Sequence, residues 1–142
     1  MRFSGMWVAV SVALICCSAF AQPLDYPKRK SGMWEAKIES VQMPGGVTTQ
    51  ECVDEKTDAE MQKQGIMGKN NGKYSCRLIS SKKTAKGWEY NSECKNPQLT
   101  VNAHTVISGD MQSAYSVDSL ARFDPPMMGQ KEMRTQMKLR YV

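Results

Sequence analysis

Hydrophobic and polar residues alternate with a period of two along most of the chain after residue 30. Trp34, Ala36 and Ile38, for example, are separated by charged residues. Alternation of this kind is typical of β-strands that have one buried and one solvent-facing side. The same pattern recurs over residues 47–53, 73–83, 87–95, 99–107, 111–123 and 133–141. The sequence therefore predicts about seven antiparallel strands.

One short stretch departs from this alternation. Thr57 and Glu60 have the spacing of a capping box, and the residues after them predict a short helix that ends near Gln64, before Gly65. Turns are predicted at residues 43–46, between the first two strands, and a break is predicted at residues 124–126, because both stretches contain proline.

The predicted fold is mainly β. Because one short helix cannot cover seven strands, the sheet is expected to fold its apolar side onto itself. Consecutive strands joined by short turns favour an antiparallel meander curled into a half-barrel or barrel, with the helix between strands two and three. The residues expected on the inner side are Trp34, Ile38, Leu78, Trp88, Tyr90, Leu99, Val101, Tyr115, Val117, Met137 and Leu139.

Residues 1–21 have the organisation of a secretion signal. Arg2 is followed by a short apolar run, and Ala19 and Ala21 are small residues at the two positions that a signal peptidase reads. We therefore predict cleavage between Ala21 and Gln22. A lipoprotein is disfavoured, because no small residue stands just before Cys16 or Cys17 in a suitable lipobox.

A permanent membrane anchor is also disfavoured. The apolar run is twelve residues long, which gives about 18 Å of helix against a hydrocarbon core of about 30 Å. Cleavage leaves 121 of the 142 residues, enough for one compact domain. The expected organisation is a signal peptide over 1–21, a flexible basic arm over 22–30 and a single β domain over 31–142.

The charge of the mature chain does not indicate a nucleic-acid partner. Once Arg2 is removed, 18 basic residues stand against 14 acidic ones, and they are scattered along the chain. Lys28-Arg29-Lys30 forms the one tight basic cluster, and it is expected to be a solvated part of the N-terminal arm.

Three cysteines follow the signal peptide, and two of them are expected to pair in an oxidising compartment. If Lys83 and Gly87 face each other across a hairpin, Cys76 lies opposite Cys94, within reach of a disulfide. We therefore predict a Cys76–Cys94 bridge. Pairing of Cys52 with either of these cysteines, or between molecules, stays open as an alternative.

No catalytic constellation can be assembled from the sequence. His104 is the single histidine and falls on the polar side of its strand, and nothing selects a nucleophile or a carboxylate pair to work with it. The cysteine spacing does not fit zinc. The chain is therefore predicted not to be an enzyme and to need no cofactor. Met127 and Met128 could offer soft thioether ligands to Cu(I), but methionine also suits adaptable contact surfaces, and the sequence favours that reading.

Several short motifs, taken in order, resemble a known family. They are Lys30-Ser31-Gly32-Met33-Trp34-Glu35, Glu51-Cys52-Val53, Cys76, the segment 88–94, Ser108-Gly109-Asp110 and the segment 123–127. Their order and spacing are similar to those of the bacterial secreted family catalogued as domain of unknown function 3617, over nearly the whole mature chain. The resemblance implies export and, because members are typically exported by Gram-negative bacteria, a periplasmic location. It implies no activity.

The same resemblance bears on the odd cysteine. Many members of the family carry a further cysteine near the C-terminus, whereas this chain ends without one. The resemblance therefore implies that Cys52 is unpaired. A looser resemblance, carried by Gly32-Met33-Trp34, is to lipocalins, which stack a basic residue of a late strand on that tryptophan. It implies such a role for Arg134 or Arg140.

Three classes of function and one further alternative follow from these observations. A protein-interaction module that uses the loop tips 43–46 and 124–129 is ranked first, and it predicts a filled core with an exposed apolar patch at one end. A carrier of a small apolar ligand is ranked second and predicts an internal cavity. A copper-handling protein with Met127 and Met128 is a further alternative, and an enzyme, ranked last, would need a polar cleft with perturbed acids.

Overall fold

A computed structural model describes residues 25–68 and 72–142 of the chain. The predicted signal peptide, its cleavage site at Ala21 and Gln22, and the first residues of the predicted arm lie outside these residues. The strands are β1 (Gly32–Ser40), β2 (Met43–Val53), β3 (Ser75–Thr84), β4 (Gly87–Lys95), β5 (Thr100–Gly109), β6 (Ala114–Met127) and β7 (Gln130–Tyr141), and one helix, α1 (Asp58–Met67), lies between β2 and β3.

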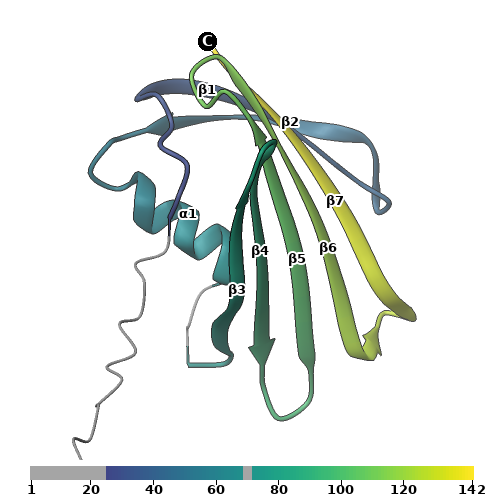
Figure 1. Ribbon diagram of the computed structural model, residues 1–142. Coiled ribbons are helices and arrows are strands. Elements are labelled where there is room, and N and C mark those ends of the chain that lie inside the picture. Colours follow the sequence, from purple (N-terminus) through teal and green to yellow (C-terminus); the bar gives the residue numbers. More distant parts are fainter. Residues whose placement is uncertain (1–24, 69–71) are drawn as a thin grey trace, which may run out of the picture.

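The seven strands form one antiparallel sheet in the order β2-β1-β7-β6-β5-β4-β3. This confirms the predicted mainly β fold with a helix between strands two and three. Strands β3 to β7 follow one another as a meander. The last strand, β7, then pairs with the first strand, β1. The sheet is strongly curved and does not close, so it is a half-barrel with β2 and β3 as its edges. The segment that contains α1 leads from one edge to the other across the concave side (Figure 1).

The turn between β1 and β2 lies two residues earlier than the alternation predicted. It is formed by Val41 and Gln42, and residues 43–46 already belong to β2. There the register shifts, so that Ile38 faces Val47 while Ser40 faces Met43. Gly45 and Gly46 absorb this bulge with positive φ angles of 98° and 71°. The prediction of a turn at 43–46 was wrong because a glycine-rich bulge has the same composition as a turn.

Strand β6 also continues past the predicted break at 124–126 and ends at Met127. Asp124 still pairs with Thr100 of β5, while the pairing with β7 is interrupted between Arg122 and Met127. Proline lacks a backbone N–H, and it is tolerated in a strand where the ladder is already interrupted.

Helix α1 starts where predicted, but not by the predicted capping box. Thr57 is the N-cap residue, yet its side chain makes no capping hydrogen bond. Thr57 has a helical conformation, its backbone N–H already donates to the carbonyl of Asp54, and its hydroxyl lies 3.5 Å from the same carbonyl. The helix also passes the predicted stop at Gly65 and ends at Met67, because the buried side chain of Ile66 holds its last turn against the sheet.

The predicted disulfide between Cys76 and Cys94 is present, and the two residues face each other across β3 and β4. The turn register is nevertheless one residue from the prediction, since Gly87 faces Thr84 rather than Lys83. A β-bulge further along β3 restores the predicted register at the cysteines.

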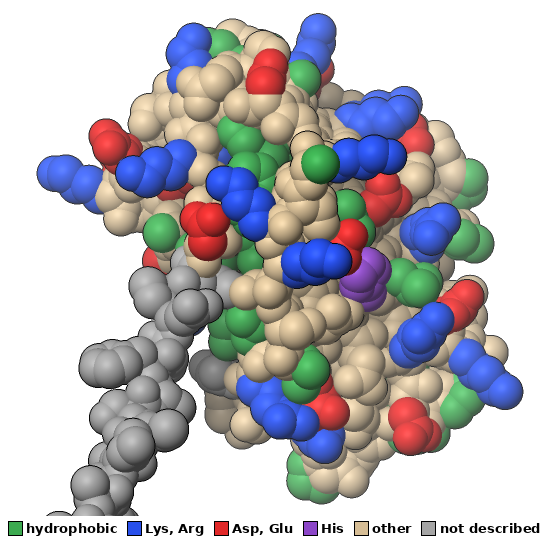
Figure 2. All heavy atoms as spheres, viewed as in Figure 1, with side chains coloured by type: hydrophobic (Ala, Val, Ile, Leu, Met, Phe, Trp, Pro, Cys, Tyr) green, Lys and Arg blue, Asp and Glu red, His purple; other side chains and the backbone are tan. Residues whose placement is uncertain are grey.

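The convex side of the sheet carries mostly polar side chains. On the face seen in Figure 2, Lys and Arg side chains lie interspersed with Asp and Glu. His104 lies on this side, exposed as predicted, with its Nδ1 2.8 Å from the Oδ1 of Asn91. His104 is thus an exposed surface histidine whose contact, Asn91, is on the neighbouring strand β4.

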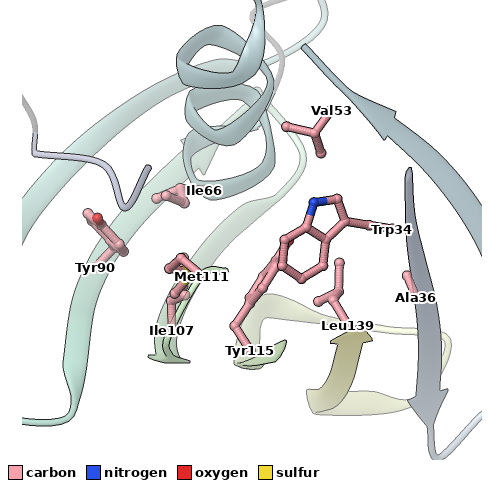
Figure 3. Close-up of a cluster of buried hydrophobic side chains, with 9 residues drawn as sticks. All are labelled: Trp34, Ala36, Val53, Ile66, Tyr90, Ile107, Met111, Tyr115 and Leu139. Atoms are coloured by element: carbon pink, nitrogen blue, oxygen red, sulfur yellow. The ribbon is translucent and has the colours of Figure 1, made fainter. Parts of the chain in front are cut away.

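The concave side holds the hydrophobic core. Trp34 is fully buried at its centre and makes edge contacts with the rings of Tyr115 and Tyr141. Four of the predicted inner residues are buried, namely Trp34, Tyr90, Tyr115 and Leu139, and four more, Leu78, Trp88, Val117 and Met137, pack against them. Ile66 from α1 and Met111 from the β5–β6 turn complete this core (Figure 3). Side chains therefore fill the concavity around Trp34.

Candidate functional site

Arg29 is a buried charge within the concavity, with 6% of its side chain exposed. Its Nε donates to Asp58 at 2.7 Å, and one of its terminal nitrogens donates to Glu51 at 2.5 Å and to the Tyr115 hydroxyl at 2.8 Å. These partners come from α1, β2 and β6, respectively. One side chain thus joins the N-terminal segment to three elements of the fold.

The electrostatics of this network favour a fixed charge. Burial lowers the pKa of Arg29, but the hydrogen bonds to Asp58 and Tyr115 outweigh that effect, so the pKa is raised above its usual value. Burial raises the pKa of the Tyr115 hydroxyl, against the opposing effect of Arg29. Arg29 stays cationic and Tyr115 stays protonated near neutral pH, so the network is suited to holding elements together.

The rest of the described N-terminal segment is also held in place. Pro27 is fully buried, and its carbonyl accepts a hydrogen bond from Gln62 of α1 at 2.7 Å. The Tyr90 hydroxyl donates to the carbonyl of Asp25 at 2.6 Å. The prediction of a solvated basic cluster is therefore wrong for Arg29, although the adjacent lysines are exposed. Three consecutive basic residues gave no signal that the middle one faces inward.

The opposite end of the sheet exposes apolar side chains. The side chains of Val41 and Met128 project from two neighbouring hairpins, with 75% and 87% of their surfaces exposed. Met43 and Met127 lie beside them in sequence and are also exposed. We call these four residues the apolar end. The tips of the β1–β2 and β6–β7 hairpins lie on the same side of the molecule, at the right in Figure 1.

A direct contact ties the two hairpins together. The side-chain amide nitrogen of Gln42, in the β1–β2 turn, lies 3.5 Å from the amide oxygen of Gln130, the first residue of β7. The sequence predicted tips at 43–46 and 124–129 separately; the pairing of β1 with β7 brings the observed β1–β2 turn, at Val41 and Gln42, beside the β6–β7 turn. Cu(I) binding by Met127 and Met128 stays a prediction.

The predicted role of a late-strand arginine at Trp34 is wrong. Arg140 faces the convex side, where it pairs with Glu35 at 2.7 Å, and Arg134 is exposed on the same side. Trp34 instead donates its indole N–H to the carbonyl of Lys30 at 2.8 Å. Successive side chains of a strand point to opposite faces of the sheet. Arg134 and Arg140 are separated from the buried Leu139 by odd numbers of residues, so they point away from the concave side that holds Trp34.

Two observations bear on metal binding and on surface hollows. Within residues 25–68 and 72–142, no three His, Cys, Asp or Glu side chains lie together in a way that could hold a metal ion. A hollow of about 640 Å³ lies on the convex side and is lined in part by Lys37, Lys138 and Arg140. It is open to solvent, and its charged side chains are those of an ordinary polar sheet surface.

Cys52 is the free cysteine of the described chain, and it is exposed on β2. Its neighbours Glu51 and Val53 point into the concavity, so its own thiol lies on the convex side. The expectation that Cys52 is unpaired within the chain agrees with this position, because the other two described cysteines are bonded to each other.

A comparison with protein families shows which family the chain belongs to. A family model described as protein of unknown function (DUF3617) matches residues 29–142. The chain belongs to this family. The DUF3617 match includes Arg29 and its partners, as well as the apolar end. No curated protein and no solved structure matches the chain. Among the described helices, none has the length and apolar character required to cross a membrane.

Proposed function

We propose that this DUF3617 protein is an exported, non-enzymatic protein-interaction module of the periplasm, and that it binds a partner protein through the apolar end. The observation that carries the proposal is the exposure of Val41 and Met128 on two hairpins that touch each other through Gln42 and Gln130. Export is supported by the signal-like residues 1–21 and by the Cys76–Cys94 disulfide, which suits an oxidising compartment.

The chemistry of the apolar end favours a protein partner. Large apolar side chains that are grouped and exposed mark interaction sites more often than they serve the fold. Full burial of one such side chain is worth about 1.5–3 kcal/mol, so two of them can contribute strongly to binding. Methionine adapts its shape to the surface that it meets, which suits Met127 and Met128 to this role.

The other candidate functions have less support. A carrier of a small apolar ligand needs a cavity, whereas the part of the concave side around Trp34 is packed with side chains. Catalysis needs a nucleophile or base in a cleft, whereas His104 is exposed and contacts Asn91. An interaction module needs neither a cavity nor a catalytic group.

Site-specific photocross-linking tests the proposal. A photoreactive amino acid is placed at position 128 and, as a matched control, at position 86, which is exposed at the tip of the β3–β4 hairpin. Irradiation of cells that produce each variant is expected to give one protein adduct of defined mass from position 128 and none from position 86. Equal adducts from both positions, or none from position 128, would contradict the proposed function.

A further inference from the structure

The open sheet leaves two edge strands, β2 and β3, and they are protected very differently. Exposed edges carry unpaired backbone N–H and C=O groups, and proteins usually guard them with lysine, proline, bulges or a covering element. Edge β3 has a bulge between Leu78 and Ser80 and is packed by α1. It also carries three cationic side chains, Arg77, Lys82 and Lys83.

Residues 47–53 of edge β2 have none of these protections. The segment contains no lysine, arginine or proline. Pro44 and the bulge at Gly45 and Gly46 protect the start of β2 and stop short of Val47. Residues 47–50 and Cys52 are exposed. Among the described residues, none outside β1 makes a backbone hydrogen bond to this part of β2.

The single charge of the segment does not guard the edge either. Glu51 faces Trp34 of β1 and points into the concavity, where it accepts the hydrogen bond from Arg29. The convex side of the segment is formed by Thr48, Gln50 and Cys52, which are uncharged or weakly polar. A strand that is rich in β-branched residues, and whose one charge is engaged on the concave side, is a suitable template for a further strand.

We propose that residues 47–53 pair in antiparallel fashion with the same residues of a second copy of this chain. A two-fold axis perpendicular to the sheet and passing beside Gln50 pairs the whole unprotected segment with itself. In that register, Val47 faces Val53 of the partner subunit and Thr48 faces Cys52 of the partner subunit. The two half-barrels then share one continuous sheet.

This register uses the whole unprotected length of the segment and brings no like charges together. Glu51 faces Thr49 of the partner subunit, so no like charges lie opposite each other. The two residues of each facing pair, such as 47 and 53, are an even number of positions apart, so their side chains point to the same face of the sheet. The concave faces of the two subunits therefore lie on the same side. A second copy therefore fits this edge, and the pairing does not involve the apolar end, so it is independent of the proposed function.

The register makes a sharp prediction for engineered cysteines. In the Cys52→Ser background, Gln50→Cys places two thiols directly opposite each other, and mild oxidation is expected to give a covalent dimer on a non-reducing gel. Thr48→Cys in the same background is the matched control and should give none by itself. Mixed with the unmodified protein, however, it should cross-link, because position 48 faces Cys52 of the partner subunit.

The unmodified protein should not cross-link by itself, because the two Cys52 thiols lie about 13 Å apart along the strands in this register. Sedimentation velocity should show a dimer that Thr48→Lys with Gln50→Lys weakens by about tenfold or more, through like charges at the edge. Ser80→Lys on the β3 edge should leave the dimer unchanged. A monomer at every concentration, equal cross-linking at all positions, or a dimer lost through Val41→Ser and Met128→Ser instead would overturn the proposal.

Discussion

The two ends of the half-barrel differ in the burial of their side chains. At one end, where β1 and β6 begin and β2 and β7 end, Arg29, Trp34 and Tyr115 are buried and bonded across several elements. At the other end, where the same strands turn back, Val41 and Met128 extend into solvent. The difference teaches that many buried contacts hold together the first end, which we call the packed end, whereas Val41 and Met128 at the apolar end lie mostly in solvent.

The largest effect is expected at the packed end. Arg29→Met removes a buried cation and leaves Asp58, whose side chain is 9% exposed, without its main partner. We expect the free energy of unfolding in urea to fall by about 3–5 kcal/mol. The matched control is Arg77→Met, since Arg77 pairs with Glu93 but is 68% exposed; this variant should change stability by less than about 1 kcal/mol. Equal losses in the two variants would show that the buried network has no special role.

The Cys76–Cys94 disulfide tests whether residues far from the packed end can also stabilise the fold. Cys76 and Cys94 lie toward the same end as the apolar end but at the β3 edge. Replacing both with serine opens a loop closed over a sequence separation of 18 residues. We expect a loss of about 3 kcal/mol, which urea unfolding with and without a reducing agent measures. An unchanged midpoint would contradict a structural role for the bridge.

A smaller effect is expected in the β5–β6 turn of the packed end. The Asp110 carboxylate accepts hydrogen bonds from the Ser113 hydroxyl and from the backbone N–H groups of Gln112, Ser113 and Ala114, which hold its pKa well below the usual range. Because the folded-state pKa is depressed, these bonds stabilise the fold above the ordinary aspartate pKa of about 3.9 and are lost as the pH falls below it.

The variant Asp110→Asn isolates this contribution. It should be less stable than the unmodified protein at pH 6, and the difference should shrink as the pH is lowered from about 4 toward 2. Thermal unfolding over this pH range measures the effect. A difference that stays constant with pH would mean that the carboxylate charge at Asp110 does not stabilise the turn.

The smallest effect on stability is expected at the apolar end. Val41→Ser combined with Met128→Ser removes exposed apolar surface, and it should change the free energy of unfolding by no more than about 0.5 kcal/mol. Trp34→Ala, in the core, is the contrasting variant and should cost about 3–5 kcal/mol. A large loss in the double variant would mean that the apolar end belongs to the fold.

The sequence predicted those features of the fold that depend on neighbouring residues. Alternation located all seven strands, because side chains on a strand point to opposite faces in turn. The bridge between Cys76 and Cys94 followed from the pairing of adjacent strands in a short hairpin. Features that depend on local backbone detail, such as the bulge at Gly45 and Gly46, were mistaken for turns because both use the same residues.

The candidate site was predictable only in part. The tip 124–129 was recognisable by composition, whereas the other tip, at Val41 and Gln42, was predicted two residues too late, at 43–46. The meeting of the two tips depends on the pairing of β1 with β7, which joins distant parts of the chain. The Arg29 network was missed altogether. Its partners Glu51, Asp58 and Tyr115 lie 22, 29 and 86 residues away, so no local pattern could indicate that this arginine is buried.

Cross-linking from position 128, with and without Val41→Ser, tests the central claim that the apolar end is a binding surface. Val41 is on the neighbouring hairpin, so its side chain should contribute to the same partner contact. We predict that Val41→Ser lowers the yield of the adduct by about tenfold, since burial of a valine side chain is worth about 1.5 kcal/mol or more. The free energy of unfolding should stay unchanged. An adduct whose yield does not depend on Val41 would contradict the claim.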